Sequence, residues 1–127
     1  MSFVFNSKRG LIIVQVEVAG PSGSAILALA LDTGATATLI NQSRLMQIGY
    51  DPAAQPDRLQ ITTGSGVEFV PRITVSKITA LGQEHNAFPV LGHTLPPSAG
   101  VDGLLGLDFF RGQELIVNFR TGQISLN

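Results

Sequence analysis

The sequence predicts an all-β fold, and three observations support this. Short apolar stretches rich in β-branched residues recur along the chain, Gly- and Pro-containing turns separate them, and little of the chain has a helical pattern. Apolar residues make up 44% of the 127 residues and charged residues 13%, with 14 Gly and 7 Pro. This length and composition are typical of one folded domain, so we expect residues 1–127 to form a single domain.

The N-terminal part of the chain predicts a β-hairpin. Residues 11–18, LIIVQVEV, and residues 24–32, SAILALALD, have the composition of strands. The turn residues GPSG, at 20–23, separate them. The second strand of this hairpin is expected to end at Asp32.

A short helix is expected in residues 41–49, NQSRLMQIG. Asn41 is placed to cap the helix and Gly49 to end it, which leaves about two turns. The apolar residues expected to face inward are Leu45, Met46 and Ile48. The following residues, 51–57, DPAAQPD, predict a polar loop.

The second half of the chain predicts further strands. Residues 58–75 read as strand, Gly-rich turn and strand, with the turn at 64–66, and the strand continues to residue 81. Residues 82–100 are interpreted as turn-rich. The remaining residues predict an apolar strand, a short helix near 108–111 and a hairpin that turns at Thr121–Gly122.

Charge and composition exclude several classes of function. The formal net charge is −1, from 8 basic and 9 acidic residues, so no basic surface for nucleic acid is expected. The chain has no Cys, which excludes disulfides and thiolate chemistry. No signal peptide or membrane-spanning stretch is recognisable, and we expect a soluble, cytoplasmic protein without membrane association.

The histidines and serines give no catalytic pattern. His85 and His93 lie in the segment interpreted as turn-rich, without a set of carboxylate ligands, so we expect solvated side chains and no metal site. Ser24, Ser43 and Ser65 lack the surroundings of a nucleophilic serine. Lys8–Arg9 is interpreted as a charged bend before the first predicted strand.

Asp32 is the residue that calls for a chemical explanation. It ends an apolar strand, where an unpaired charge is costly, and a Thr-Gly pair follows it. Gly34 would allow its amide to approach the carboxylate, and the Thr33 hydroxyl could brace the turn. One carboxylate cannot act as base and acid together, whereas two carboxylates about 3 Å apart share one proton and supply both functions.

Two segments carry a family resemblance. Residues 30–40, ALDTGATATLI, resemble the active-site strand and loop of the retroviral-type (retropepsin-like) aspartic proteases, and the similarity is closer to their bacterial single-domain members. Residues 100–110, GVDGLLGLDFF, resemble the second signature of the same family. The predicted hairpin around residues 64–66 lies between them in the expected order, so the resemblance covers most of the chain.

The resemblance implies a small, closed-barrel-like all-β fold with one or two short helices, a flap hairpin and an active site at a homodimer interface. Asp32 would be the catalytic residue, one from each subunit, and the loop residues that support it would be Thr33, Gly34 and Ala35. The flap would run from about Ile61 to Phe69, with its tip at Thr63, Gly64, Ser65 and Gly66. The second signature would comprise Leu104, Leu105 and Gly106.

The implied function is that of an aspartic endopeptidase, which hydrolyses peptide bonds by activating a water between two Asp32 carboxylates. It needs no cofactor and no metal, and its partners are a second copy of the chain and an extended peptide or protein. Where retroviral members commonly have Arg-Asp or Arg-Asn after the second-signature Gly, this chain has Leu107–Asp108.

Other interpretations stay open at this point. The fold could serve as a peptide-binding or dimerisation module with little or no turnover, and the Gly-Ser-Gly turn could be an ordinary hairpin. A monomer could draw its second carboxylate from Asp102 or Asp108, although helix capping or surface exposure explains these residues better. The C-terminal strands could pair between subunits or close the core of one chain. LALALDTG and AGVDGLLG also share a weak internal similarity.

Overall fold

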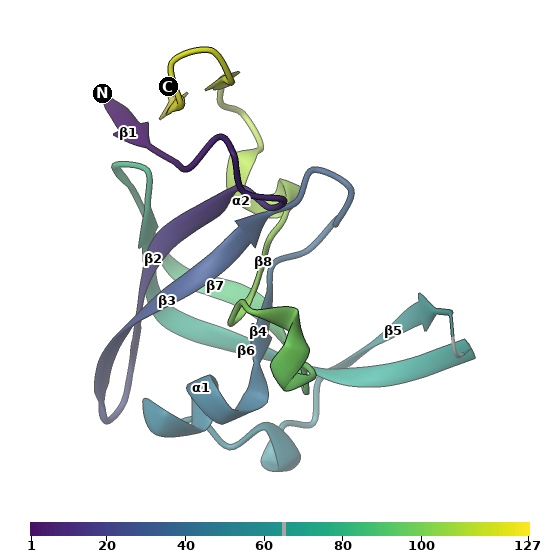
Figure 1. Ribbon diagram of the computed structural model, residues 1–127. Helices are drawn as coiled ribbons and strands as arrows, with labels where there is room; N and C mark the ends of the chain where they lie inside the picture. The colour runs from purple at the N-terminus through teal and green to yellow at the C-terminus, as the bar shows by residue number, and fades with distance from the viewer. Residues whose placement is uncertain (65) are drawn as a thin grey trace.

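The centre of the molecule is a closed barrel of six strands (Figure 1). The computed structural model describes residues 1–64 and 66–127, so Ser65, which the sequence places at the tip of a flap, lies outside the described residues. In their order around the barrel, the strands are β2 (Ile13–Gly20), β3 (Gly23–Leu31), β8 (Gly103–Leu105), β4 (Leu39–Asn41), β7 (Gln83–His93) and β6 (Gly66–Ala80). Pairing of β6 with β2 closes the barrel and confirms the predicted all-β fold.

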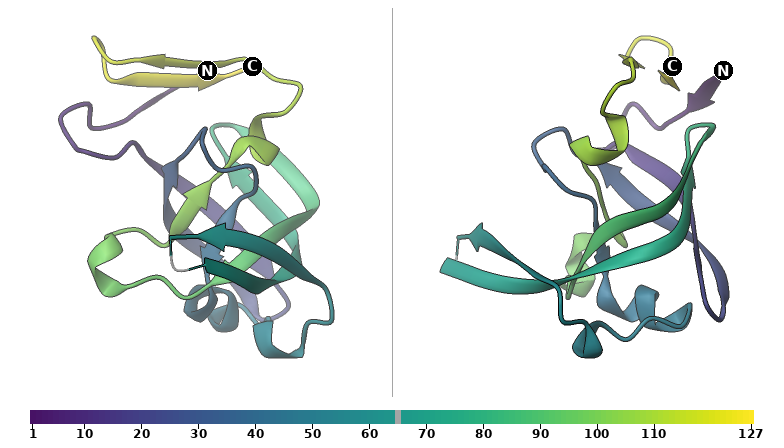
Figure 2. Two further views of the ribbon diagram at one scale, coloured as in Figure 1. Left: turned by 90° about the vertical axis from the view of Figure 1, so that its right-hand side faces the viewer. Right: turned by 180° about the vertical axis from the view of Figure 1, so that it is seen from behind.

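The long strand β6 belongs to two parts of the molecule. Its first residues pair with β5 (Arg58–Thr63), and its later residues pair with β7 and β2. Residues 58–72 therefore form a hairpin that extends away from the barrel, called the projecting hairpin below (Figures 1 and 2). It matches the second predicted hairpin.

A small sheet covers one end of the barrel, and both chain termini lie there (Figure 1). Its strands, in the order of pairing, are β1 (Ser2–Val4), β10 (Gln123–Leu126) and β9 (Leu115–Asn118). The sequence did not predict β1. In this single chain the C-terminal strands pair with β1 and contribute Ile124 and Leu126 to the core.

Alternating side chains of the barrel strands build the core. Val14, Val16 and Val18 of β2 are buried, as are Leu27 and Leu29 of the paired strand β3. This is the period-two pattern of a strand with one face toward the interior. The hairpin predicted at the N-terminal part of the chain is thereby confirmed, with strand ends shifted by one or two residues.

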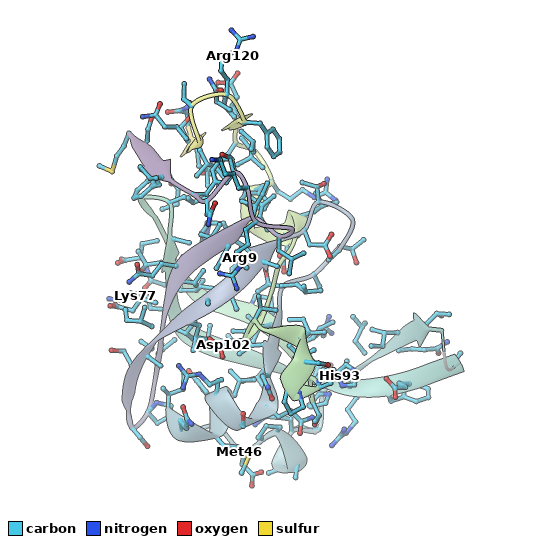
Figure 3. The ribbon with its side chains drawn as sticks, viewed as in Figure 1. Arg9, Met46, Lys77, His93, Asp102 and Arg120 are labelled. Atoms are coloured by element: carbon cyan, nitrogen blue, oxygen red, sulfur yellow. The ribbon has the colours of Figure 1, made fainter. Side chains whose placement is uncertain are left out.

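Helices are few and short, as predicted. Helix α1 (Gln42–Gln47) begins after Asn41, whose side-chain oxygen accepts a hydrogen bond from the Ser43 amide at 3.3 Å. Leu45 and Ile48 point inward as expected, but the prediction for Met46 is wrong because its side chain is 61% exposed (Figure 3). A helix this short buries one face only. The other helical turns are η1 (Pro52–Ala54), η2 (Pro97–Ala99) and α2 (Leu107–Phe110).

The interpretation of residues 82–100 as turn-rich is wrong for residues 83–93, which form strand β7. Phe88 and Val90 face the core, while Ala87, with a φ of 50°, interrupts the regular pairing with β6. Pro89 is tolerated because β4 pairs with β7 only from Leu91 onward, so no ladder partner on that side needs an amide from residue 89.

Candidate active site

The loop after β3 holds the Asp32 carboxylate in a defined position. The Asp32 amide donates to the Leu105 carbonyl at 3.0 Å, and the Gly34 amide donates to Asp32 Oδ1 at 2.9 Å. A Cβ on Gly34 would lie 3.1 Å from the same oxygen, which explains the preference for Gly. Asp32 is half-buried, whereas Thr33 and Gly34 are exposed in the single chain.

The second segment singled out by the sequence lies directly beside this loop. Strand β8 runs parallel to β3, with Leu31 opposite Leu105, and antiparallel to β4. Leu105 is fully buried, and Leu104 is half-buried. The two similar segments noted in the sequence are therefore neighbours in space, each ending at this place.

Gly106 allows the two segments to touch. A Cβ at this position would lie 2.7 Å from the carbonyl carbon and oxygen of Ala37 and 2.9 Å from the oxygen of Ala35. The next residue, Leu107, donates its amide to the Ala35 carbonyl at 2.8 Å. Ala35 thus holds the loop against the second segment.

A further connection between these segments involves Asp108 and Thr38, which the sequence analysis did not assign to the site. Thr38 donates from its amide to both oxygens of Asp108, at 3.0 and 2.9 Å, and from its hydroxyl to Oδ1 at 2.7 Å. The same hydroxyl accepts from the Gly106 amide at 3.1 Å. Thr38 is completely buried, so it depends on these partners.

Asp102 and Asp108 therefore do not have the roles expected from the sequence. Asp108 binds the loop, and Gly106 rather than a carboxylate precedes α2 as its N-cap. Asp102 Oδ2 accepts from the Ala28 amide at 2.9 Å, and its other oxygen lies 3.5 Å from Arg44 Nε. A polar residue at the start of an apolar run, here Thr38 in ATATLI, was the signal available for the first of these contacts.

In the residues named below, hereafter the Asp32 platform, the loop and the second segment form one hydrogen-bonded unit. It comprises residues 32–38 and 103–108. Opposite the platform lies the projecting hairpin, and the space between them is a cavity of about 450 Å³. Its lining comprises Gly34, Ala35, Thr36, Ala37, Leu39, Leu59, Gln60, Ile61, Thr62, Leu91 and Leu104.

Two charged contacts hold the projecting hairpin. At its base, Arg72 donates from Nε and Nη2 to the two oxygens of Asp57 at 2.8 and 3.2 Å. These hydrogen bonds, together with the charge of the guanidinium, lower the pKa of Asp57 and raise that of Arg72. Farther along, Glu68 Oε2 lies 3.2 Å from His93 Nε2.

The tip of the projecting hairpin is described in part. Thr63 pairs with Gly66 through the backbone, and Gly66 has a φ of 120°. Gly64 has open space where a side chain would begin. The neighbouring apolar side chains of β6, Val67 and Phe69, are exposed to solvent.

The expectation that both histidines are solvated is wrong. The His85 ring packs edge-on against Phe109, with centroids 4.8 Å apart, and lies close to Phe88. His93 is engaged by Glu68, as described above. Within residues 1–64 and 66–127, no cluster of three or more His, Cys, Asp or Glu residues has an arrangement that could hold a metal ion.

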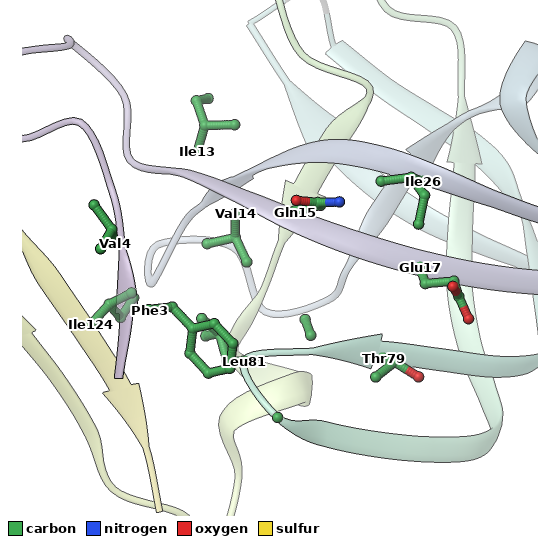
Figure 4. A pocket seen from close by; sticks show the side chains of 12 residues that line it. Phe3, Val4, Ile13, Val14, Gln15, Glu17, Ile26, Thr79, Leu81 and Ile124 are labelled. Atoms are coloured by element: carbon green, nitrogen blue, oxygen red, sulfur yellow. The ribbon is translucent and has the colours of Figure 1, made fainter. Parts of the chain in front are cut away.

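A separate hollow of about 320 Å³ lies between β1 and the outer face of β2 and β3 (Figure 4). Phe3, Val4, Ile13 and Ile26 contribute to its apolar lining, and its one ionisable side chain is Glu17. Since Asp32 and the Gly residues of the platform are not part of this lining, the hollow is distinct from the cavity at the Asp32 platform.

No helix in the described part of the chain is long and apolar enough to cross a membrane. Lys8 and Arg9 lie in the turn between β1 and β2, where the Arg9 amide donates to the Asn6 carbonyl at 3.2 Å, in agreement with the predicted bend.

Comparisons with known proteins agree with this architecture. The chain is similar, over its full length and 89% of the other chain, to the crystal structure of a retropepsin-like aspartic protease from Rickettsia conorii, with a TM-score of 0.75 and 16% sequence identity. No curated protein matches the sequence significantly. The model of the family described as "gag-polyprotein putative aspartyl protease" matches residues 14–112, which include the platform and the projecting hairpin. The chain thus belongs to this retropepsin-like aspartic protease family.

Proposed function

We propose that the chain is one subunit of a homodimeric aspartic endopeptidase, with Asp32 as the catalytic residue of each subunit. The observation that carries the proposal is the position of Asp32, half-buried on a hydrogen-bonded platform that faces a cavity under the projecting hairpin. The family and the fold support a protease function.

A second copy of the chain supplies what one chain lacks. A single platform offers one carboxylate, whereas a twofold axis at the loop brings Asp32 against its own copy. Thr33 and Gly34, exposed in the single chain, would then lie in the interface. In this proposal Thr33 makes the reciprocal contacts between the loops, and Gly34 and Ala35 hold each loop in shape.

The paired carboxylates would share one proton and divide the chemical work. The ionised carboxylate removes a proton from a water molecule, whose oxygen bonds to the peptide carbonyl carbon, while the protonated carboxyl donates to the carbonyl oxygen. Collapse of this adduct breaks the C–N bond, and the amine leaves with a proton from the carboxyl that received one. The projecting hairpin acts as the flap that closes over an extended peptide.

The first test replaces the catalytic carboxylate. We expect Asp32→Asn to lower kcat/KM on a mixed peptide library by about 10³-fold or more, because the amide can neither accept nor share the proton. The matched control is Glu84→Gln, an exposed carboxylate on β7 whose contact is a 3.7 Å ion pair with Lys77. Equal cleavage by Asp32→Asn and the parent protein would reject the assignment.

A second test asks whether two chains share the site. After equal amounts of parent and Asp32→Asn protein are mixed and allowed to exchange subunits, about a quarter of the dimers carry two intact carboxylates, so the activity per total protein falls to about a quarter. A monomeric enzyme would retain half. A peptide-binding module would bind library peptides in the cavity without cleaving them in either experiment.

A further inference from the structure

The outer end of the cavity under the projecting hairpin carries a charge. Ile61 lines the cavity, and Glu68 is its direct partner across the β5–β6 ladder. Leu91 also lines the cavity, and His93 lies two residues farther along β7, on the same face of that strand. The contact between Glu68 and His93 therefore borders the cavity, close to where the hairpin leaves the barrel (Figure 3).

The register of the hairpin shows which of its faces carries Glu68. Directly opposed residues in an antiparallel pair share a face, as do residues two apart on one strand. Glu68 thus shares a face with Val70, which is buried and turned toward the barrel. Phe69, on the opposite face, is 64% exposed. Glu68 consequently points to the cavity side, and its side chain is 45% exposed there.

His93 orients the carboxylate without cancelling its charge. The Thr94 amide donates to His93 Nδ1 at 3.0 Å, so this nitrogen serves as an acceptor and carries no proton. The remaining ring nitrogen, Nε2, then carries the proton and donates it to Glu68 Oε2 at 3.2 Å. A neutral imidazole leaves the full negative charge on Glu68.

The other charged groups of the hairpin do not compensate this charge. Arg72 is bound by both oxygens of Asp57 at the base. Arg58 is opposite Pro71 and shares a face with Gln60 and Phe69, the face away from Glu68. The cavity itself has no ionisable side chain among its described lining residues.

We propose that Glu68 makes the outer end of the cavity a subsite for a basic side chain of the peptide, and that this subsite rests on the endopeptidase function proposed above. An extended peptide in the cavity presents alternate side chains to the same face, about 7 Å apart. An uncharged apolar side chain fills the cavity beside Ile61, and the residue two positions away reaches Glu68. The expected substrates therefore combine an apolar residue with Lys or Arg two residues distant, and disfavour Asp or Glu there.

The experiment uses peptides that differ only at this position, with Lys, Gln or Glu. At near-neutral pH and low salt, we expect the parent protein to cleave the Lys peptide with a kcat/KM about tenfold higher than the Glu peptide, mainly through KM, since exposed charge pairs contribute this much when attraction and repulsion are combined. In Glu68→Gln, which can still accept from His93, the ratio should fall to about twofold or less. In Glu68→Lys the order should reverse, while Glu84→Gln keeps the parent ratio.

Binding of the same peptides to the Asp32→Asn variant separates the two proposals. Cleavage without a charge preference, or a preference that persists in Glu68→Gln and Glu68→Lys, would overturn the subsite and leave the endopeptidase assignment intact. Binding with the expected preference, but no cleavage by the parent protein, would overturn the endopeptidase assignment and retain the subsite. Neither binding nor cleavage would overturn both.

Discussion

The Asp32 platform and the projecting hairpin face the same cavity but are built differently. The platform joins two distant chain segments through buried contacts, with Thr38 fully enclosed and Gly106 pressed against backbone atoms. The hairpin is held by its own ladder and by exposed ion pairs. Segments with few buried contacts open at lower free energy than packed ones, so the platform is expected to keep its geometry while the hairpin moves.

Removal of the Asp108 carboxylate should have the largest effect on this difference. In Asp108→Ala the buried Thr38 amide and hydroxyl lose their acceptor, and we expect the free energy of unfolding in urea to fall by about 3 kcal/mol. Asp108→Asn keeps one acceptor oxygen and should lose about half as much. Peptide cleavage by both variants should decline in the same order.

Asp51→Ala provides the matched control, because this carboxylate also accepts from a backbone amide, that of Ala53 at 3.1 Å, but at an exposed turn. Loss of such a cap costs about 1 kcal/mol or less. If Asp108→Ala were no more destabilising than Asp51→Ala, the platform would not be the rigid side of the cavity.

The same substitution at two Gly residues gives a smaller effect and a direct comparison. In Gly106→Ala the new Cβ would overlap the backbone of Ala35 and Ala37, so we expect a loss of about 2 kcal/mol in the free energy of unfolding. In Gly64→Ala the Cβ enters open space, and the change should stay within about 0.5 kcal/mol. Thermal and urea unfolding of the two variants would measure the contrast, which equal losses would contradict.

Acid should weaken the base of the hairpin, with the smallest effect of the three. Hydrogen bonding by Arg72 lowers the pKa of folded Asp57 below its ordinary value of 3.8, so this contact stabilises the fold above that pH and is lost as the pH falls through the lower, folded pKa. Amide protection of β5, followed by NMR during acid titration, should decrease in this range. Arg72→Gln should remove this part of the pH dependence, and Arg72→Lys should retain some of it.

An unchanged titration in Arg72→Gln would show that the base of the hairpin does not depend on this contact. A decrease of protection that begins at the platform rather than in β5 would contradict the proposed order of mobility.

Local sequence patterns predicted much of the fold because each strand shows its buried face. The alternation in β2 and β3, the cap at Asn41 and the turn at Gly122 all act within a few residues. Strand β7 was missed because its first half, QEHNA, is polar and Pro89 suggested a loop. Only the neighbouring strands show that this edge has no partner for the missing amide.

The candidate site was predictable where its residues are adjacent in the sequence, as in the contact of Gly34 with Asp32. Contacts across the molecule were not predictable from local patterns. Asp108 was interpreted as a capping or surface residue because nothing near it in the sequence indicates that it would meet Thr38. The packing of His85 against Phe109 likewise depends on how β7 and α2 meet.

The bond between Thr38 and Asp108 spans 70 residues of sequence, and this separation has a consequence for how the molecule acquires its active form. Contacts between distant segments form slowly, since the intervening chain must first be ordered. During synthesis the Asp32 loop emerges from the ribosome long before the segment that completes it. Incomplete chains would therefore hold an unfinished site, and hydrolytic activity would appear only once the last third of the polypeptide has joined the barrel.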